Sequence, residues 1–267
     1  MYVDSHCHLS FPELVAQWPQ IRSEMRQAQV AAALCVCTHM EEFDAIHALA
    51  SSEPWLWASV GVHPDTEGAL EPSVDDLVRA AQSAKVIAIG ETGLDYYRLG
   101  TRTVVDMEWQ RERFRVHIRA ARETGLPLII HTRGAGDDTL RLLREEGAGQ
   151  VTGVFHCFTD TMAVAQAALE LGFYISFSGI LSFRNAEDLR AVARSVPMER
   201  CLIETDSPYL APMPHRGKTN TPAYLPYVAK ALAQEKALSA EAVGEATRIN
   251  FERLFKVTVP ALEISAT

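Results

Sequence analysis

The sequence predicts a single-domain (β/α)8 TIM barrel, which is an α/β fold. Eight short strand-like runs alternate with longer helical patterns along the chain. Strands that alternate with helices form a parallel sheet, because parallel neighbours need crossover connections. The chain has 267 residues, and eight such units commonly close into a barrel at about 250 residues. A doubly wound open sheet is the alternative that the same pattern allows.

The predicted strands are short β-rich runs, and several of them end in a residue type that ligates metals. The first run contains Asp-Ser-His-Cys-His, and the last one ends in Glu-Thr-Asp. In chain order the eight runs are residues 2–8, 31–37, 56–63, 86–91, 127–132, 153–158, 173–178 and 201–206.

The predicted helices lie between and after these runs. At 109–123, Phe114, Ile118 and Ala121 recur at helical spacing, which is typical of an amphipathic helix. Another helical pattern, at 162–171, ends at Gly172, a residue type favoured at helix C-caps. The further helical segments are 224–233 and 240–255.

Arginines are concentrated in the helix predicted at 109–123. Glutamates alternate with them, which favours a solvated helix face over a stripe that binds nucleic acid. The net charge of −9 likewise argues against a broad basic surface for duplex nucleic acid. The arginines are Arg111, Arg113, Arg115, Arg119 and Arg122, and the glutamates are Glu108, Glu112 and Glu123.

The barrel domain is expected to span residues 1–258, followed by a loose tail at 259–267. The N-terminus has no basic-then-apolar signal pattern, and no run of 18 apolar residues occurs, so neither export nor a membrane span is expected. We therefore predict a cytoplasmic protein without a membrane association, and the sequence indicates no protein partner.

The strongest functional signal is a pair of histidines near the N-terminus. Asp4, His6 and His8 are two residues apart, so on a strand their side chains share one face. In a barrel that face points inward, and the two histidines lie nearest the C-terminal mouth, where barrel active sites form. Two imidazoles on one strand face suit a metal ion, although this motif alone is weak.

Four other predicted strands strengthen the metal interpretation. They end at Glu91, His131, His156 and Asp206. Buried unpaired carboxylates and imidazoles cost roughly several kcal/mol each, so six of them around one barrel mouth would be very unfavourable without a cation. The joint pattern predicts a metal site at the strand ends.

Six ligands exceed the four that one zinc ion usually takes, so they indicate two divalent ions that share a carboxylate. Glu91 is the best bridge, being the lone carboxylate from the middle strands. Two-metal hydrolytic sites activate a water between or beside the ions. One ion would take His6, His8, Glu91 and Asp206, and the other Glu91, His131 and His156.

Asp206 is the candidate general base, because a carboxylate can both ligate a metal and accept a proton from water. Glu204 lies two residues earlier on the same face and is a candidate for orienting the ligands, as is Asp4. A structural role for Glu204 is an equal alternative.

Candidate substrate contacts surround this predicted site. His63 ends the third strand, and Arg133 shares a face with His131. Arg216 and Lys218 lie in the loop after the eighth strand. Guanidinium and ammonium groups suit phosphate oxygens, although a surface role is the alternative for each of them.

Five sequence blocks resemble the TatD family of metal-dependent deoxyribonucleases. They are VDSHCHL near the start, IGETGLDYY at 89–97, IIHTR at 129–133, HCF at 156–158 and LIETDSP at 202–208, and 215–233 is also similar to the C-terminal motif of that family. The chain departs from the usual pattern at Ser10 and Asp65, where the family has Asp or Asn and His, respectively.

The resemblance implies a TIM barrel, a divalent-metal site at the six matching positions, and a single-stranded DNA or RNA substrate. It implies exonucleolytic cleavage of phosphodiester bonds by metal-activated water, with Mg, Mn or Zn as the candidate metals. Amide, lactone or phosphoester hydrolysis of a small molecule is the alternative, and a non-catalytic metal-binding protein is a third class. Many amidohydrolase-like sites bridge their metals with a modified lysine, and Glu91 at that position favours the nuclease-like branch.

Overall fold

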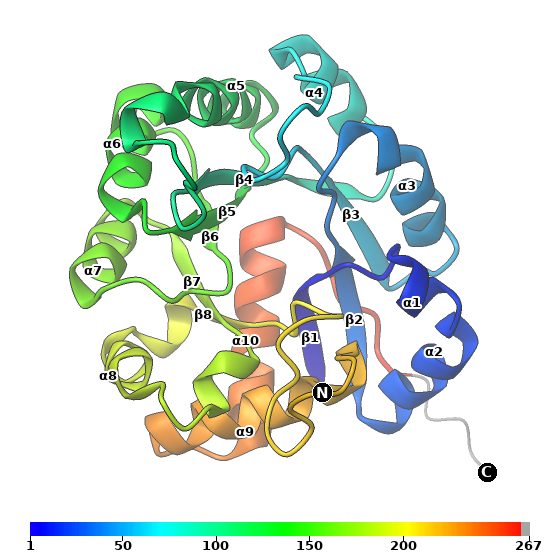
Figure 1. The fold of residues 1–267 in the computed structure, drawn as a ribbon. Helices are drawn as coiled ribbons and strands as arrows, with labels where there is room; N and C mark the ends of the chain where they lie inside the picture. Colours follow the sequence, from blue (N-terminus) through cyan, green and yellow to red (C-terminus); the bar gives the residue numbers. More distant parts are fainter. Residues whose placement is uncertain (263–267) are drawn as a thin grey trace.

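The structure, a computed structural model that describes residues 1–262, contains one sheet of eight strands. All neighbouring strands pair in parallel, in the order of the chain, and helices surround them (Figure 1). This arrangement confirms the predicted TIM barrel. The strands are β1 (Tyr2–Cys7), β2 (Val30–Cys35), β3 (Leu56–Val60), β4 (Val86–Asp95), β5 (Leu128–Arg133), β6 (Gly153–Phe155), β7 (Tyr174–Phe177) and β8 (Cys201–Ile203).

The helices cover the outside of the barrel, and short 3-10 turns join several of them to the strands. The α-helices are α1 (Pro12–Val15), α2 (Trp18–Gln27), α3 (Phe43–Ser51), α4 (Val74–Ala81), α5 (Glu108–Thr124), α6 (Gly136–Gly147), α7 (Met162–Glu170), α8 (Glu187–Ser195), α9 (Leu225–Lys236) and α10 (Ala240–Phe255). The 3-10 turns are η1 (Met40–Glu42), η2 (Val104–Met107), η3 (Gly179–Ser182), η4 (Met198–Arg200) and η5 (Pro222–Tyr224).

Strand β4 is longer than the sequence predicts. It continues past Glu91 because Thr92 to Asp95 pair with β5, up to Arg133. Gly93 permits this pairing: its φ of +135° suits only glycine, and a Cβ there would collide with the carbonyl oxygen of His131. The predicted ligand on β4 therefore lies inside a strand rather than at its end.

Three strands stop three residues earlier than predicted, and three others stop one or two residues earlier. Strand β3 ends at Val60, β6 at Phe155 and β8 at Ile203. The residues that follow them turn away from the sheet, and Asp206 adopts a left-handed backbone conformation with φ 53°. The polar residues predicted at these strand ends therefore lie in the first turn of the loops, where their side chains face the barrel mouth.

The seam between β1 and β8 closes through individual hydrogen bonds. The Asp206 amide donates to the carbonyl of His6 (2.9 Å), and the Thr205 amide and hydroxyl donate to the Asp4 carboxylate at 2.9 and 2.6 Å. The Ser5 hydroxyl donates to the carbonyl of Ile203 (3.0 Å). These contacts bring the first and last strands together and complete the ring.

Helix α5 differs from the expected solvated face. Arg111 and Arg113 are 7% and 3% exposed, so the expectation is wrong for these two residues. Arg111 donates to the carbonyls of Val104 and Val105, while Arg113 donates to the carbonyl of His63 (2.7 Å). Each guanidinium group is buried against a loop whose carbonyl oxygens it binds. Arg111 binds the loop before α5, and Arg113 binds the loop before α4.

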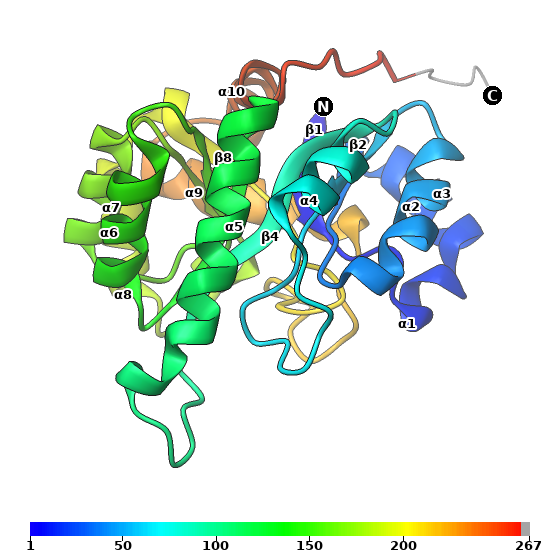
Figure 2. The same ribbon diagram turned by 90° about the horizontal axis from the view of Figure 1, so that it is seen from above.

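The two ends of the barrel are covered differently. Helix α10 lies at the end where the chain begins, whereas the loops after β4 and β8 project from the opposite end (Figure 2). Val259, where the predicted tail starts, is 6% exposed and its amide donates to Glu252; residues 263–267 lie outside the described part. Among the described residues, none of the helices has the length and apolarity to cross a membrane.

Candidate metal centre

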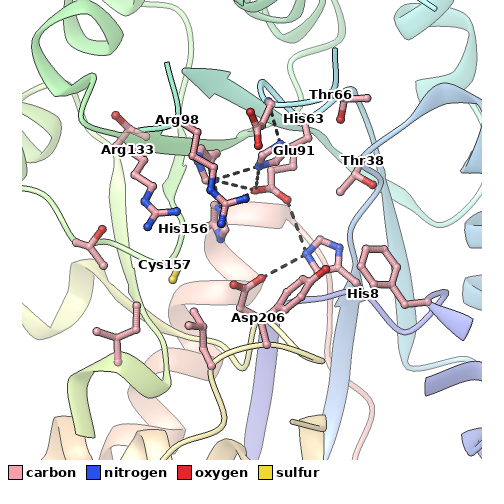
Figure 3. Close-up of a pocket in the computed structure, with 18 of the residues that line it drawn as sticks. His8, Thr38, His63, Thr66, Glu91, Arg98, Arg133, His156, Cys157 and Asp206 are labelled. Carbon is pink, nitrogen blue, oxygen red and sulfur yellow. Dashed lines mark hydrogen bonds and ion pairs between the residues drawn. The ribbon is translucent and has the colours of Figure 1, made fainter. Parts of the chain in front are cut away.

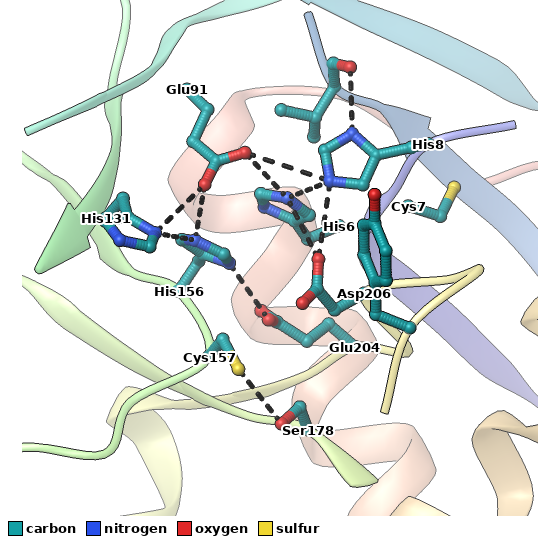
Figure 4. A network of polar contacts seen from close by, with 12 residues as sticks. His6, Cys7, His8, Glu91, His131, His156, Cys157, Ser178, Glu204 and Asp206 are labelled. Carbon is teal, nitrogen blue, oxygen red and sulfur yellow. Dashed lines mark hydrogen bonds and ion pairs between the residues drawn. The ribbon is translucent and has the colours of Figure 1, made fainter. Parts of the chain in front are cut away.

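The side chain of Glu91 stands between two groups of histidines at the barrel mouth (Figure 4). Glu91 comes from the middle of β4 and is 2% exposed. Its Oε2 faces His6 in β1 and His8 directly after it, and its Oε1 faces His131 in β5 and the histidines that follow β3 and β6. The structure thus brings all six predicted ligands together: His6, His8, Glu91, His131, His156 and Asp206.

The first group gathers nitrogen and oxygen atoms around one point. The Nε2 atoms of His6 and His8 lie 3.2 Å apart, and Glu91 Oε2 lies 3.3 Å from the former. Asp206 Oδ1 is 3.3 Å from His8 Nε2 and 3.7 Å from His6 Nε2. Four donor atoms from β1, β4 and the β8 loop therefore converge.

The second group surrounds the other oxygen of the same carboxylate. Glu91 Oε1 lies 2.8 Å from His156 Nε2 and 3.3 Å from His131 Nδ1. The Nε2 atom of His63 is 3.4 Å from the same oxygen. Glu91 is the member common to both groups, as expected of a bridge.

The donor set fits a divalent cation. Imidazole nitrogens and carboxylate oxygens are the usual ligands of Zn and related ions. His6 and His8 are both buried, and their Nε2 atoms lie beside carboxylate oxygens of Glu91 and Asp206, so one cation among them could bind all four donor atoms. The residues present therefore match a metal site in chemistry and in placement.

The far nitrogens of three histidines are held by oxygen acceptors. His131 Nε2 lies 3.0 Å from Asp95 Oδ2, and His156 Nδ1 lies 3.1 Å from Glu204 Oε1. His8 Nδ1 lies 3.4 Å from the carbonyl oxygen of Val36. An acceptor at one ring nitrogen puts the proton there and leaves the lone pair of the other nitrogen for a metal.

His63 has the opposite arrangement. Its Nδ1 accepts a hydrogen bond from the backbone amide of Asp65 (3.1 Å), so in a neutral ring the proton is on Nε2. That nitrogen points at Glu91 and at His131 Nδ1 (3.3 Å). His63 is thus oriented as a hydrogen-bond donor, although its position beside Glu91 and His131 resembles that of a ligand.

The protonation states agree with anionic ligands. Burial would raise the pKa of Glu91, but His156, His63 and His6 hold it well below its usual range. Burial likewise opposes ionisation of Asp206, whose pKa is nevertheless lowered by His8 and His6. Both carboxylates are therefore negatively charged.

A cavity of about 750 Å³ opens onto this centre. His63 and Arg133, two predicted substrate contacts, line it, and so does Arg98 from the loop after β4; Figure 3 shows the two arginine side chains in this cavity. Arg216 and Lys218 are exposed and do not line it; the Arg216 guanidinium lies over the ring of Phe183 instead, at 4.4 Å.

The remaining predicted residues lie behind the ligands. Glu204 is fully buried, contacts His156 and does not line the cavity. Asp4 binds Thr205 at the seam. Sequence reasoning missed Asp95, the partner of His131, although the spacing of Glu91 and Asp95 by four residues on one strand would have suggested a shared face.

Comparisons with known proteins find similarity over nearly the whole chain. A model of the family described as "TatD related DNase" matches residues 3–256. The chain is 43% identical to the "Uncharacterized metal-dependent hydrolase YcfH" of Escherichia coli K12, over 98% of each chain. It is 32% identical to the "3'-5' ssDNA/RNA exonuclease TatD" of Edwardsiella piscicida, over 90% of this chain and 93% of that protein. Its fold matches the crystal structure of YJJV, a TatD homolog from Escherichia coli K12, with a TM-score of 0.88, 27% identity and coverage of 96% and 98%.

Proposed function

We propose a phosphodiesterase activity for this chain from one premise: it belongs to the TatD-related DNase family of metal-dependent hydrolases. The proposed substrate is single-stranded DNA or RNA, which the protein would cleave from one end as an exonuclease. The observation that carries the proposal is that each of the two carboxylate oxygens of Glu91 faces its own group of histidine nitrogens.

Two divalent ions, with Mg, Mn and Zn as candidates, are proposed to share Glu91. His6, His8 and Asp206 would complete the ligand set on the Oε2 side. His131 and His156 would complete the set on the Oε1 side. When bound, such ions bind phosphate oxygens and lower the pKa of a water molecule.

The side chains supply the proton transfers and the orientation. Asp206 lines the cavity and is ionised, so its carboxylate is the proposed acceptor of the proton from the attacking water. His63 Nε2–H is the proposed donor to a substrate oxygen. Glu204 and Asp95 orient the imidazoles of His156 and His131, and are positioning residues.

Charge favours a phosphodiester over a neutral substrate. Two ligand carboxylates, Glu91 and Asp206, leave a net charge of about +2 when two divalent ions are bound. The cavity also contains Arg98 and Arg133. An anionic substrate is thus attracted to this end of a protein whose net charge is −9. The Edwardsiella relative, named as a single-stranded DNA and RNA exonuclease, supports the same substrate class.

The test uses the full chain, stripped with a chelator and reloaded separately with Mg, Mn or Zn. End-labelled single-stranded DNA and RNA, with the corresponding duplexes, are incubated with each preparation. We expect a ladder of products that shortens from one end, and faster cleavage of single strands. Turnover of an amide or lactone panel without release of nucleotides would favour the small-molecule alternative. Inactivity on every substrate would favour a non-catalytic metal-binding protein.

A further inference from the structure

Two arginines in the cavity, Arg98 and Arg133, form no ion pair with a described residue. Neither Arg98 nor Arg133 takes part in any ion pair or side-chain hydrogen bond among residues 1–262. By contrast, Arg111 and Arg113 on the neighbouring helix are both paired with carboxylates. Guanidinium groups that line a cavity beside a metal centre and lack a protein partner are available to an anion.

Arg133 is held in place by stacking rather than by a carboxylate. Its guanidinium lies over the ring of Tyr97, 3.6 Å from the ring centroid, and Tyr97 is 63% exposed. The nearby Asp95 is already engaged, because it binds His131 Nε2 and accepts the amide of Tyr97 (2.8 Å). The stack fixes the plane of the guanidinium and leaves its N–H groups free.

The loop that carries Arg98 is anchored next to the same strand ends. Tyr96 donates from its hydroxyl to Asp138 (2.8 Å) and accepts from Arg111 (3.0 Å). The amide of Tyr96 also donates to the carbonyl of Arg133 (2.8 Å). The loop therefore places Arg98 at the cavity that Arg133 also lines, and its side chain reaches toward the middle of that cavity in Figure 3.

A second cavity of about 660 Å³ begins at Arg133, and its lining includes Asp160 and Asp188. These acidic side chains disfavour phosphate. The positive region thus extends from the metal centre to Arg133 and ends there, which leaves room for one additional anion next to the one at the metals.

We propose that Arg98 and Arg133 form a second phosphate-binding site, which takes the phosphate adjacent to the scissile phosphodiester on the same strand. The inference rests on the proposed function and adds a recognition element to it. The cavity volume of about 750 Å³ is in the range of pockets that hold a whole small ligand, so it accommodates more than the scissile group.

The test compares dTpdT with its two phosphorylated forms, pdTpdT and dTpdTp, using the metal-loaded full chain. One of the two phosphorylated forms should be cleaved with a kcat/KM about tenfold or more above that of dTpdT, because charge-assisted hydrogen bonds have this strength. In Arg98→Ala/Arg133→Ala, the kcat/KM of the preferred phosphorylated form divided by that of dTpdT should fall to about one. Because each variant's kcat/KM is divided by its own value for dTpdT, a change in basal turnover cancels from the ratio.

Two control variants separate the site from general electrostatics. Arg26→Ala/Arg144→Ala removes two exposed charges away from the cavity and should keep the wild-type ratio. Arg98→Lys/Arg133→Lys retains both charges and should keep most of it. A wild-type ratio near one for both phosphorylated forms, or an unchanged ratio in the double alanine variant, would overturn the proposal. Failure of the wild type to cleave either the dinucleotides or the end-labelled single strands would overturn the phosphodiesterase assignment as well.

Discussion

At the scale of single residues, Glu91 links the two groups of histidines at the barrel mouth. Its two carboxylate oxygens face different histidine groups, and the residue is almost fully buried. An amide in its place would keep the shape but would lose the negative charge on both sides. Any metal ion that this side chain ligates would then bind to the protein more weakly.

Glu91→Gln should lower the metal content of the reloaded protein from about two ions to one or fewer. Hydrolysis should fall about 100-fold or more, since ligand changes commonly cost at least as much as changes in the residues that orient ligands. Metal analysis by mass spectrometry, with turnover measured on the same samples, checks both effects. Glu123→Gln, at an exposed residue of α5, is the matched control; an unchanged metal content in Glu91→Gln would refute a bridging role.

His63 differs from the four histidines assigned as ligands. Because its Nδ1 accepts the amide of Asp65, we expect His63→Ala to retain the full metal content. The rate of hydrolysis should nevertheless fall roughly 10- to 100-fold, because the variant lacks the hydrogen-bond donor to the substrate oxygen. His131→Ala is the comparison, and should lose metal. Equal metal loss in both variants would instead make His63 a ligand.

The residue types and positions of the six ligand candidates were readable from the sequence, because four of them end predicted strands and His6 and His8 share one strand face. The direction of each imidazole was not. It depends on partners such as Asp95 and Glu204, and on the backbone amide of Asp65, which only the folded chain brings to the rings.

At the scale of elements, helix α5 positions the loop that carries His63. The amide of Val62 donates to His117 Nε2 (3.0 Å), and His117 Nδ1 donates to the carbonyl of Arg113 (2.8 Å). Arg113 itself donates to the carbonyl of His63. A fully buried imidazole thus links the helix to the end of β3.

This link gives a defined pH dependence of stability. Burial lowers the pKa of His117 to about 4, below its unfolded value, so its contribution is present above about pH 6.5 and is lost as the pH falls toward 4. The free energy of unfolding should decrease by about 3 kcal/mol more in the wild type than in His117→Gln over this interval. Urea denaturation of both chelator-treated proteins at several pH values measures the difference; parallel pH profiles would contradict it.

Helix positions were predicted well from apolar periodicity, as the agreement of 240–255 with α10 illustrates. Strand ends were predicted less well. The extent of β4 depends on its pairing with β5 and on the backbone of Gly93 against His131. A pattern within one strand contains no information on that partner.

At the scale of the whole molecule, the barrel depends on a seam that side chains complete. The alternation of strands and helices predicted the ring, but the Asp4–Thr205 contact joins residues 201 positions apart. Asp4 is fully buried, and burial, opposed by hydrogen bonds from Thr205, raises the pKa of Asp4 to about 7. Its oxygens therefore need the donors that Thr205 provides.

Thr205→Val should lower the free energy of unfolding by about 1–3 kcal/mol, since it leaves a buried carboxyl oxygen without its hydroxyl donor. Thr205→Ser keeps the hydroxyl and should cost less. Urea denaturation of the metal-loaded proteins compares them. If valine proves no worse than serine, the hydroxyl does not stabilise the seam.

The same seam joins the first strand and the loop after the last strand at the metal centre. His6 and His8 emerge first during synthesis, whereas Asp206 follows only after all eight strands have been made. A growing or truncated polypeptide that stops before Asp206 therefore lacks one member of the ligand set. Ribosome-bound chains of this hydrolase should accordingly be inert, and acquisition of activity should coincide with completion of the last strand.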